Sequence, residues 1–324
     1  MRFALAFFLV AATAALAEAP EIIDMHLHAH TLDQYGGGAK VCFNTEPMEF
    51  PGVDPRQVIT IEAVMKCPHP VAQATSDEAV MRESLAVLKR RNAIAVTSGP
   101  LAQVKKWRDA DRARVIPAIS FLTDEMRSPA ELRKLFAAKE FAVFAEIGAQ
   151  YRGISLDDPK LEPYFALAEE LDIPVGVHLG EGPPGGIHVG GNPDYRVSLG
   201  SPLQLETVLV KHPKLRLWVM HYGSPFVDEM IALLYSHPQV YVDIAQNDWG
   251  FPRAHFYAQL QKLVDAGFAK RILFGSDQMI WPGAIDVAID TIESAPFLSA
   301  AQKHDIFSGN ARRFLRLPPV ESSK

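Results

Sequence analysis

The stretch EIIDMHLHAH, residues 21–30, places one aspartate and three histidines at alternate positions, Asp24, His26, His28 and His30. The apolar residues between them are typical of a buried β-strand, in which every second side chain points to the same face. This pattern predicts a strand that sends a row of polar, ionisable side chains to one face.

The rest of the chain alternates between strand and helix patterns. Short apolar stretches predict seven further strands, at 93–99, 114–120, 141–149, 174–180, 215–223, 240–245 and 271–277. Segments with helical spacing lie between them, such as DEAVMRESLAVLKRRN at 77–92. Alternating strands and helices indicate parallel βαβ units, and eight units in about 300 residues match a (β/α)8 TIM barrel. An open doubly wound sheet is the alternative, but no Gly-x-Gly-x-x-Gly follows the first strand.

Two regions extend the single barrel domain predicted for residues 18–324. A long loop rich in Gly and Pro follows the first strand, at about residues 30–75, and helical segments extend the C-terminus. Cys42 and Cys67 are the two cysteines of the chain, and both lie in this loop. They predict a disulfide that staples the loop, with two separate thiols as the alternative.

The first residues have the pattern of a cleaved signal peptide. Residues 1–17, MRFALAFFLVAATAALA, combine Arg2 with an apolar run and end in Ala15-Leu16-Ala17, a small-x-small cleavage site. The run is shorter than the roughly 20 residues that span a bilayer. We therefore expect export, with the bacterial periplasm as the destination, and no membrane attachment after cleavage.

Composition bounds the class of protein. The chain has 324 residues, of which 48% are hydrophobic and 22% charged, with a net charge of −6. These values are ordinary for a globular protein, and the mild acidity argues against nucleic acid as a partner. A small-molecule substrate is the expected partner, and the sequence is compatible with a homo-oligomer.

The predicted strand ends carry the candidate metal ligands. In a TIM barrel, functional side chains come from the C-terminal ends of the strands. Six imidazole or carboxylate side chains lie there: His26, His28, Glu146, His178, His221 and Asp277. Imidazoles and carboxylates are the ligands of zinc and related divalent ions, so these residues predict a metal site.

Three further polar residues lie near the candidate ligands in sequence. Asp24 either orients a ligand imidazole or is a buried, hydrogen-bonded carboxylate, and the sequence does not decide between these roles. His30 lies one step beyond the strand and is expected in a loop or beside the substrate. Asp243, inside VYVDIA, is expected to support the structure.

The combined motifs resemble the amidohydrolase superfamily, and within it the amidohydrolase-related group of metal-dependent hydrolases. The matching features are Asp-x-His-x-His on the first strand, the histidines that end VGVHLG and LWVMHYG, and the aspartate of LFGSD. The C-terminal stretch DIFSGNARRFLRL is also similar to that group. The resemblance covers essentially the whole chain after the signal peptide.

The resemblance implies a role for each candidate ligand. His26, His28 and Asp277 would bind a first metal ion, and His178 would bind that ion or a second one. His221 would bind a second ion or polarise the substrate. The resemblance therefore implies one or two divalent ions, with zinc as the expected metal.

Strand four departs from a common pattern of the superfamily. Many members with two metals have a carboxylated lysine there, whereas this chain has FAEIGAQ with Glu146. Glu146 would then either bridge two ions or support a single-ion site. The alternative without a metal is a buried carboxylate paired with a basic group.

The ligand set indicates hydrolysis of an amide, ester or lactone bond in a small organic molecule. A bound ion lowers the pKa of water to about 7, and Asp277 would act as the general base while His221 stabilises the oxyanion. Phosphoester hydrolysis also fits the ligands. The alternative function is non-oxidative decarboxylation of an aromatic or unsaturated carboxylic acid, which members of the same group catalyse. A binding protein without activity is the third class, and the intact ligand set argues against it.

Loops after the strands provide candidate substrate contacts. The long segment EGPPGGIHVGGNPDYR, residues 181–196, contains Glu181, Tyr195 and Arg196. Arg196 could pair with a substrate carboxylate through two hydrogen bonds. Trp249 is expected to form an apolar wall of the site.

Overall fold

Eight parallel strands form the centre of the computed structural model, which describes residues 21–35, 38–121, 126–189 and 191–318. The predicted signal peptide, residues 1–17, lies outside the described residues. The strands follow one another around the sheet in sequence order: β1 (Ile22–His28), β4 (Ala93–Ser98), β5 (Val115–Ile119), β6 (Val143–Ile147), β7 (Val175–His178), β8 (Leu217–Met220), β9 (Val240–Asp243) and β10 (Ile272–Leu273).

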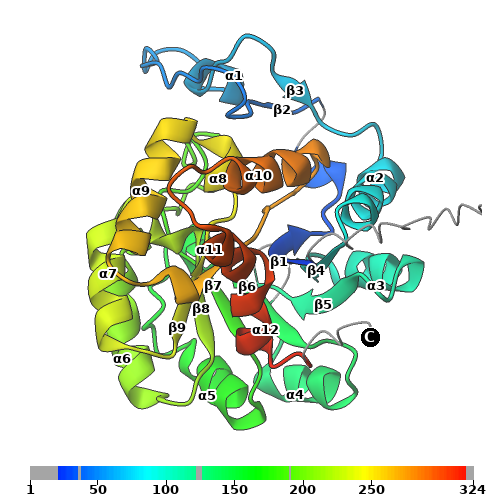
Figure 1. The fold of residues 1–324 in the computed structure, drawn as a ribbon, viewed down its shortest axis with the longest axis vertical. Coiled ribbons are helices and arrows are strands. Elements are labelled where there is room, and N and C mark those ends of the chain that lie inside the picture. Colours follow the sequence, from blue (N-terminus) through cyan, green and yellow to red (C-terminus); the bar gives the residue numbers. More distant parts are fainter. Residues whose placement is uncertain (1–20, 36–37, 122–125, 190, 319–324) are drawn as a thin grey trace, which may run out of the picture.

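The chain after β10 returns to β1 and brings the two edges of the sheet together. The Met25 amide donates to the Phe274 carbonyl at 2.8 Å, and the Asp277 amide donates to the His26 carbonyl at 2.6 Å. Closure removes the exposed edges of the sheet. The predicted TIM barrel is therefore confirmed, and Figure 1 shows the strands surrounded by helices.

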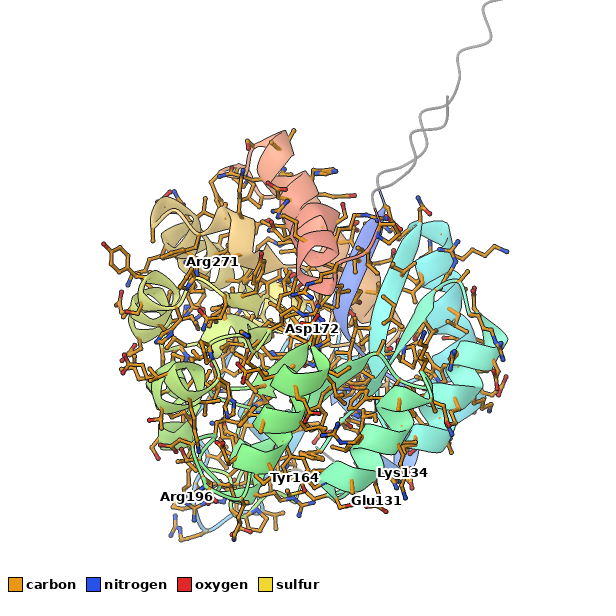
Figure 2. The ribbon with its side chains drawn as sticks, turned by 90° about the horizontal axis from the view of Figure 1, so that it is seen from below. Glu131, Lys134, Tyr164, Asp172, Arg196 and Arg271 are labelled. Carbon is orange, nitrogen blue, oxygen red and sulfur yellow. A yellow bond between two sulfur atoms is a disulfide. The ribbon has the colours of Figure 1, made fainter. Side chains whose placement is uncertain are left out.

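Helices connect successive strands and cover the outside of the barrel (Figures 1 and 2). The connecting helices are α2 (Asp77–Arg90), α3 (Leu101–Ala110), α4 (Pro129–Ala137), α5 (Glu162–Leu171), α6 (Leu205–Lys211), α7 (Val227–Ser236), α8 (Asn247–Gly250) and α9 (Arg253–Asp265). The C-terminal extension contains α10 (Gly283–Glu293), α11 (Ala300–His304) and α12 (Asn310–Leu315). Within the described residues, none of these helices has the length and apolarity needed to cross a membrane.

Apolar side chains fill the end of the barrel where the strands begin. Trp218 of β8 is fully buried in this interior cluster, and Phe314 of α12 packs edge-on against it at 5.5 Å between ring centroids. A Cβ atom at Gly176 of β7 would lie only 2.4 Å from the Trp218 ring. Glycine is therefore required at that position, and α12 closes this end of the barrel.

The loop after β1 folds into a small separate layer, which we call the flap, residues 38–75. It contains β2 (Lys40–Val41) paired antiparallel with β3 (Val71–Ala72), and the short helix α1 (Ile61–Val64). Cys42 and Cys67 form the predicted disulfide within it. Figure 1 shows the flap as a layer beyond α8 and α10.

The first strand is less regular than the alternating pattern predicts. Its pairing with β4 shifts register between Asp24 and Leu27. Ile23 and Met25 belong to the barrel interior, and the ring of His26 also lies inside, 3.5 Å from Glu146. The expectation that Asp24 shares one face with His26 is therefore wrong, because an irregularity separates them.

Candidate metal centre

Four ligand atoms converge where β1, β6 and the segment after β10 end. The Nε2 atoms of His26 and His28 are 3.1 Å apart. Oε2 of Glu146 lies 3.5 and 3.4 Å from these two nitrogens, and Oδ1 of Asp277 lies 3.6 and 3.0 Å from them. Zinc bonds of about 2.0–2.2 Å in a tetrahedral site separate ligand atoms by about 3.3–3.6 Å. The two histidine nitrogens therefore lie at about the spacing of metal ligands from each of the two carboxylates. Two sets of three with all atoms within 4.8 Å of one another are His26, His28 and Glu146 on one side, and His26, His221 and Asp277 on the other.

A second group of ligand atoms lies on the other side of Glu146. Atoms of Glu146, His178 and His221 all lie within 4.8 Å of one another, and Oε1 of Glu146 is 4.0 Å from Nε2 of His178. The two oxygens of Glu146 thus face different groups of histidines. This arrangement suits a carboxylate that bridges two ions, and it also suits one ion with Glu146 as a single ligand.

The histidine rings are held by oxygen atoms near their Nδ1 atoms. These partners are the Ser98 hydroxyl at 2.9 Å for His28, the Gln150 side-chain oxygen at 3.2 Å for His178, and the Ala245 carbonyl at 2.9 Å for His221. A neutral imidazole that donates from Nδ1 presents the Nε2 lone pair to a metal. These contacts at Nδ1 therefore orient the three rings so that Nε2 can act as a metal ligand.

The carboxylate of Asp243 lies beside the remaining histidine. Its Oδ2 atom lies 3.2 Å from Nδ1 of His26 and accepts a hydrogen bond from the indole of Trp218 at 3.0 Å. Its Oδ1 atom accepts from the amides of His221 and Ala245 at 2.8 and 3.1 Å. The sequence predicts only a structural role for Asp243, whereas its carboxylate also lies beside a candidate ligand ring. The sequence feature that could have indicated this position is an acidic residue inside the apolar strand VYVDIA.

Burial and charge favour a cation at this centre. Glu146 and Asp277 are buried, and among the described residues all of their ion-pair partners are histidines. Burial opposes the charge on Glu146, yet its interaction with the His26 ring holds its pKa below its usual value. Burial lowers the pKa of His178 to about 3, so that ring is neutral. Two buried carboxylates without lysine or arginine partners need positive charge nearby. A bound metal ion would supply it, and so would a protonated His26 ring: burial opposes the charge on His26, but Asp277 and Asp243 raise its pKa well above the usual value.

Backbone conformation at two of these positions is unusual. His221 and Asp277 have φ angles of 56° and 45°, in the left-handed region that non-glycine residues seldom adopt. Residues in such conformations often cluster at functional sites. His221 follows directly after β8, whereas Asp277 lies in the segment after β10, and both side chains belong to the cluster of candidate ligands.

A cavity of about 560 Å³ lies above the cluster and has the size of a small-molecule site, about 300–1,000 Å³. Its base includes all of the candidate ligands except His26. Its walls include aromatic residues and methionines, and the flap covers one side with Val41, Ile61 and Met65. The candidate ligands are therefore accessible to a small molecule from one side.

The four predicted substrate contacts fall into two groups. Glu181 and Trp249 line the cavity. Tyr195 is buried behind it and donates to the Gly180 carbonyl at 2.6 Å. Arg196 lies at the edge of the molecule (Figure 2), where its guanidinium donates to backbone carbonyls of its own loop. The structure therefore does not bring Tyr195 and Arg196 to the cavity wall.

Asp24 is a buried carboxylate whose oxygens are occupied. It accepts hydrogen bonds from the Ser276 amide at 3.0 Å, from the Ser276 hydroxyl and from the His26 amide at 2.9 Å. It contacts no imidazole ring, so the structure supports the second of its two predicted roles. Burial raises its pKa to about 7.

Tyr151 is a candidate that the sequence did not reveal. Its hydroxyl lies 3.0 Å from Nε2 of His178, and it lines the cavity. Tyr151 follows β6 in a short turn, and nothing in its local sequence distinguishes it from a core tyrosine. Only the folded barrel places it beside a predicted ligand.

The fold and this cluster define a TIM-barrel protein with a candidate divalent-metal centre at the C-terminal ends of its strands. A family model described as Amidohydrolase matches residues 23–317. The chain therefore belongs to the amidohydrolase family, and this membership supports an enzyme. No curated protein sequence matches the chain.

Solved structures share the fold at low sequence identity. An uncharacterised TIM-barrel protein from Bordetella bronchiseptica is 19% identical, with a TM-score of 0.62 over 91% of this chain and 98% of that one. A probable 2-pyrone-4,6-dicarboxylic acid hydrolase from Acinetobacter baumannii is 13% identical, with a TM-score of 0.57 over 91% and 99%. A dihydroxybenzoic acid decarboxylase from Polaromonas, with bound manganese, is 15% identical, with a TM-score of 0.54 over 73% and 86%. These likenesses concern the fold.

Proposed function

We propose that the protein is a metal-dependent hydrolase that cleaves an amide, ester or lactone bond in a small organic molecule. The observation that carries this proposal is the convergence of His26, His28, Glu146 and Asp277 at the spacing of metal ligands, beneath a cavity of small-molecule size. We assign His178 and His221 to the same centre, as ligands of the first ion or of a second.

The protein's own residues supply the proton transfers. A bound divalent ion would act as a Lewis acid and lower the pKa of water to about 7. Burial disfavours the charge on Asp277, but His26 and His28 keep its pKa below the usual value, so its carboxylate is ionised. Asp277 can then accept a proton from the attacking water and return it to the leaving group. His221 lines the cavity and is positioned to polarise the substrate oxygen.

Decarboxylation is the competing function, because several structural neighbours are described as decarboxylases. One feature of the cavity favours hydrolysis. Among its described lining residues there is no arginine, and Lys40, whose side chain is exposed, is the single lysine. A carboxylate substrate would therefore depend on the metal ion for charge neutralisation. A neutral ester, amide or lactone needs no further cation.

The test of this function compares the two reactions on one preparation. Metal-loaded protein would be assayed with a panel of aryl esters, lactones and amides, and with 2,6-dihydroxybenzoate as a decarboxylase substrate. We expect hydrolysis without release of carbon dioxide, and a loss of at least about 100-fold in His26→Ala and Asp277→Asn. Both variants should keep the circular dichroism of the folded protein. Carbon dioxide release with no hydrolysis would establish the competing function instead.

We further propose that the metal is zinc and that the protein is exported. The imidazole and carboxylate ligands suit zinc, although manganese is the ion in one structural neighbour. The Cys42–Cys67 disulfide supports an oxidising compartment. Reconstitution with zinc or manganese in parallel tests the first proposal. The N-terminal sequence of protein recovered from a periplasmic extract, expected to begin at Glu18, tests the second.

A further inference from the structure

We propose that Trp281 and His30 are two hydrogen-bond donors, the donor pair, each of which can bind a carbonyl or hydroxyl oxygen of an uncharged substrate in the cavity above the metal-binding cluster. This inference rests on the proposed function, because it names the kind of molecule that the hydrolase would accept.

Trp281 supplies the first donor. It lines the cavity, only 7% of its surface is exposed, and its Nε1 atom has no hydrogen-bond partner among the described residues. An indole N–H can only donate, and buried polar groups almost always have a partner. An unpaired buried donor costs free energy that an acceptor on the ligand would recover.

A second tryptophan in the same cavity shows the contrast. Trp249 also lines the cavity, but its indole N–H donates to the carbonyl of Ser276. The two indole N–H groups are therefore chemically alike, but one is already hydrogen-bonded and the other is not. Only the N–H of Trp281 is available to a ligand.

His30 supplies the second donor. It is 3% exposed and lines the cavity, and its Nε2 atom has no partner among the described residues. Its Nδ1 atom contacts the hydroxyl of Tyr35. If Tyr35 donates to Nδ1, the proton of the ring is on Nε2, which leaves one group unpaired. The opposite tautomer leaves both Nε2 and the Tyr35 proton unpaired, so Nε2–H is favoured.

Tyr35 lies between the two donors and links them to the metal-binding cluster. Its ring packs edge-on against Trp281, with centroids 5.8 Å apart, and its hydroxyl meets His30. The ring of His30 stacks on that of His28 at 4.2 Å. A ligand oxygen held by His30 would therefore lie close to the reacting centre, with Trp281 farther along the cavity wall.

The rest of the cavity sets the charge of the ligand. Its lining contains the carboxylates of Glu146, Glu181 and Asp277, and no arginine among the described residues. Aromatic and methionine side chains, such as Met279, form much of the wall. These surroundings favour an uncharged, aromatic or alicyclic molecule that carries an oxygen acceptor.

Equilibrium binding of two probes of similar shape tests the donor pair. Zinc-loaded full-length protein would be titrated by calorimetry with 4-acetylphenol, which carries a carbonyl acceptor, and with 4-isopropylphenol, which lacks it. The measured quantity is the ratio of the two dissociation constants. We expect Trp281→Phe to reduce the preference for the acetyl compound by about fivefold or more, the worth of one hydrogen bond. His30→Leu should act in the same direction.

Trp249→Phe is the matched control, because it makes the same substitution in the same cavity at an indole that is already bonded. It should leave the ratio unchanged. An unchanged ratio in Trp281→Phe, an equal loss in Trp249→Phe, or no binding of either compound to the wild type would overturn the donor pair. Probe preference without any hydrolysis would contradict the proposed function alone. Hydrolysis with an unchanged ratio would contradict the donor pair alone.

Discussion

Asp243 connects three strands at a single carboxylate. It lies 3.2 Å from Nδ1 of His26 and binds the indole of Trp218 and the amide of His221. A carboxylate behind a ligand histidine fixes the orientation of the ring and raises its affinity for metal. We therefore regard Asp243 as part of the metal centre, although the cavity does not expose it.

The first prediction concerns this carboxylate. Asp243→Asn should lower the affinity for zinc about 10- to 100-fold, because the amide holds the His26 ring less firmly. Competition with a chromophoric chelator measures this affinity. Asp228→Asn, which alters an exposed aspartate paired with Lys262, is the control and should bind zinc as the wild type does. Equal zinc affinity in Asp243→Asn would show that the carboxylate has only a structural role.

Asp248 gives a second residue-scale prediction, which concerns pH. Both of its carboxylate oxygens are buried without a partner among the described residues, and burial raises its pKa well above the usual value. The folded state therefore holds a proton that the unfolded state releases above about pH 4. The contribution of Asp248 to stability is present below that pH and is lost as pH rises toward the folded pKa.

Asp248→Asn should remove this dependence. The unfolding free energy of the variant, relative to the wild type, should increase as pH rises from about 4 to 8. Urea titrations at a series of pH values measure it, with the exposed Asp265 changed to Asn as the control. A difference that stays constant across this range would refute the assignment of a raised pKa.

At the scale of elements, β1 shows what alternation can and cannot predict. His26 and His28 were correctly expected to lie together, and they face the same centre. The alternating pattern also grouped Asp24 with them, whereas the register shift after Asp24 separates it. Hydrophobic alternation reports the average face of a strand. It can show neither a register shift nor the hydrogen bond that Asp24 accepts from the distant residue Ser276.

The flap is the element whose stability depends most directly on the disulfide. Cys42 and Cys67 are 25 residues apart in sequence. Closing a loop of this length is worth about 3.5 kcal/mol in the chain-entropy account. Val41 and Met65, which lie close to the two cysteines in sequence, line the cavity.

The double variant Cys42→Ser/Cys67→Ser should therefore unfold at a lower temperature and bind the probe 4-acetylphenol more weakly. It should still bind zinc, because none of the candidate ligands belongs to the flap. Differential scanning calorimetry and elemental analysis measure these two properties on the same sample. Loss of zinc together with the disulfide would show that the flap contributes to the metal centre.

For the whole molecule, strand count and strand order could be predicted from sequence, since each βαβ unit leaves a local pattern. The role of the C-terminal helices in closing one end of the barrel could not be predicted. The helical spacing around Phe314 indicates an apolar face, but only the folded chain shows that this ring closes the barrel against Trp218. The antiparallel pairing of β2 with β3 in the flap was also not predicted, because strands of two residues leave no recognisable pattern in the sequence.

The candidate site was predictable to the extent that barrel geometry fixes the strand ends. His178 and Asp277 could be placed because each ends a predicted strand. Loop residues were placed less well, since Arg196 lies at the edge of the molecule and Trp281 lies in the cavity. The path of a loop depends on tertiary contacts that its own sequence does not encode.

Metal content per chain tests the central claim most directly. Protein purified without chelator or added metal would be measured by elemental analysis, beside His28→Ala prepared in the same way. We expect about one or two tightly held divalent ions per wild-type chain, with fewer in His28→Ala because one ligand of the cluster is lost. Two ions would assign Glu146 as a bridge. A wild-type chain that holds no metal, and takes up none when zinc is added, would contradict the metal centre and the hydrolase built on it.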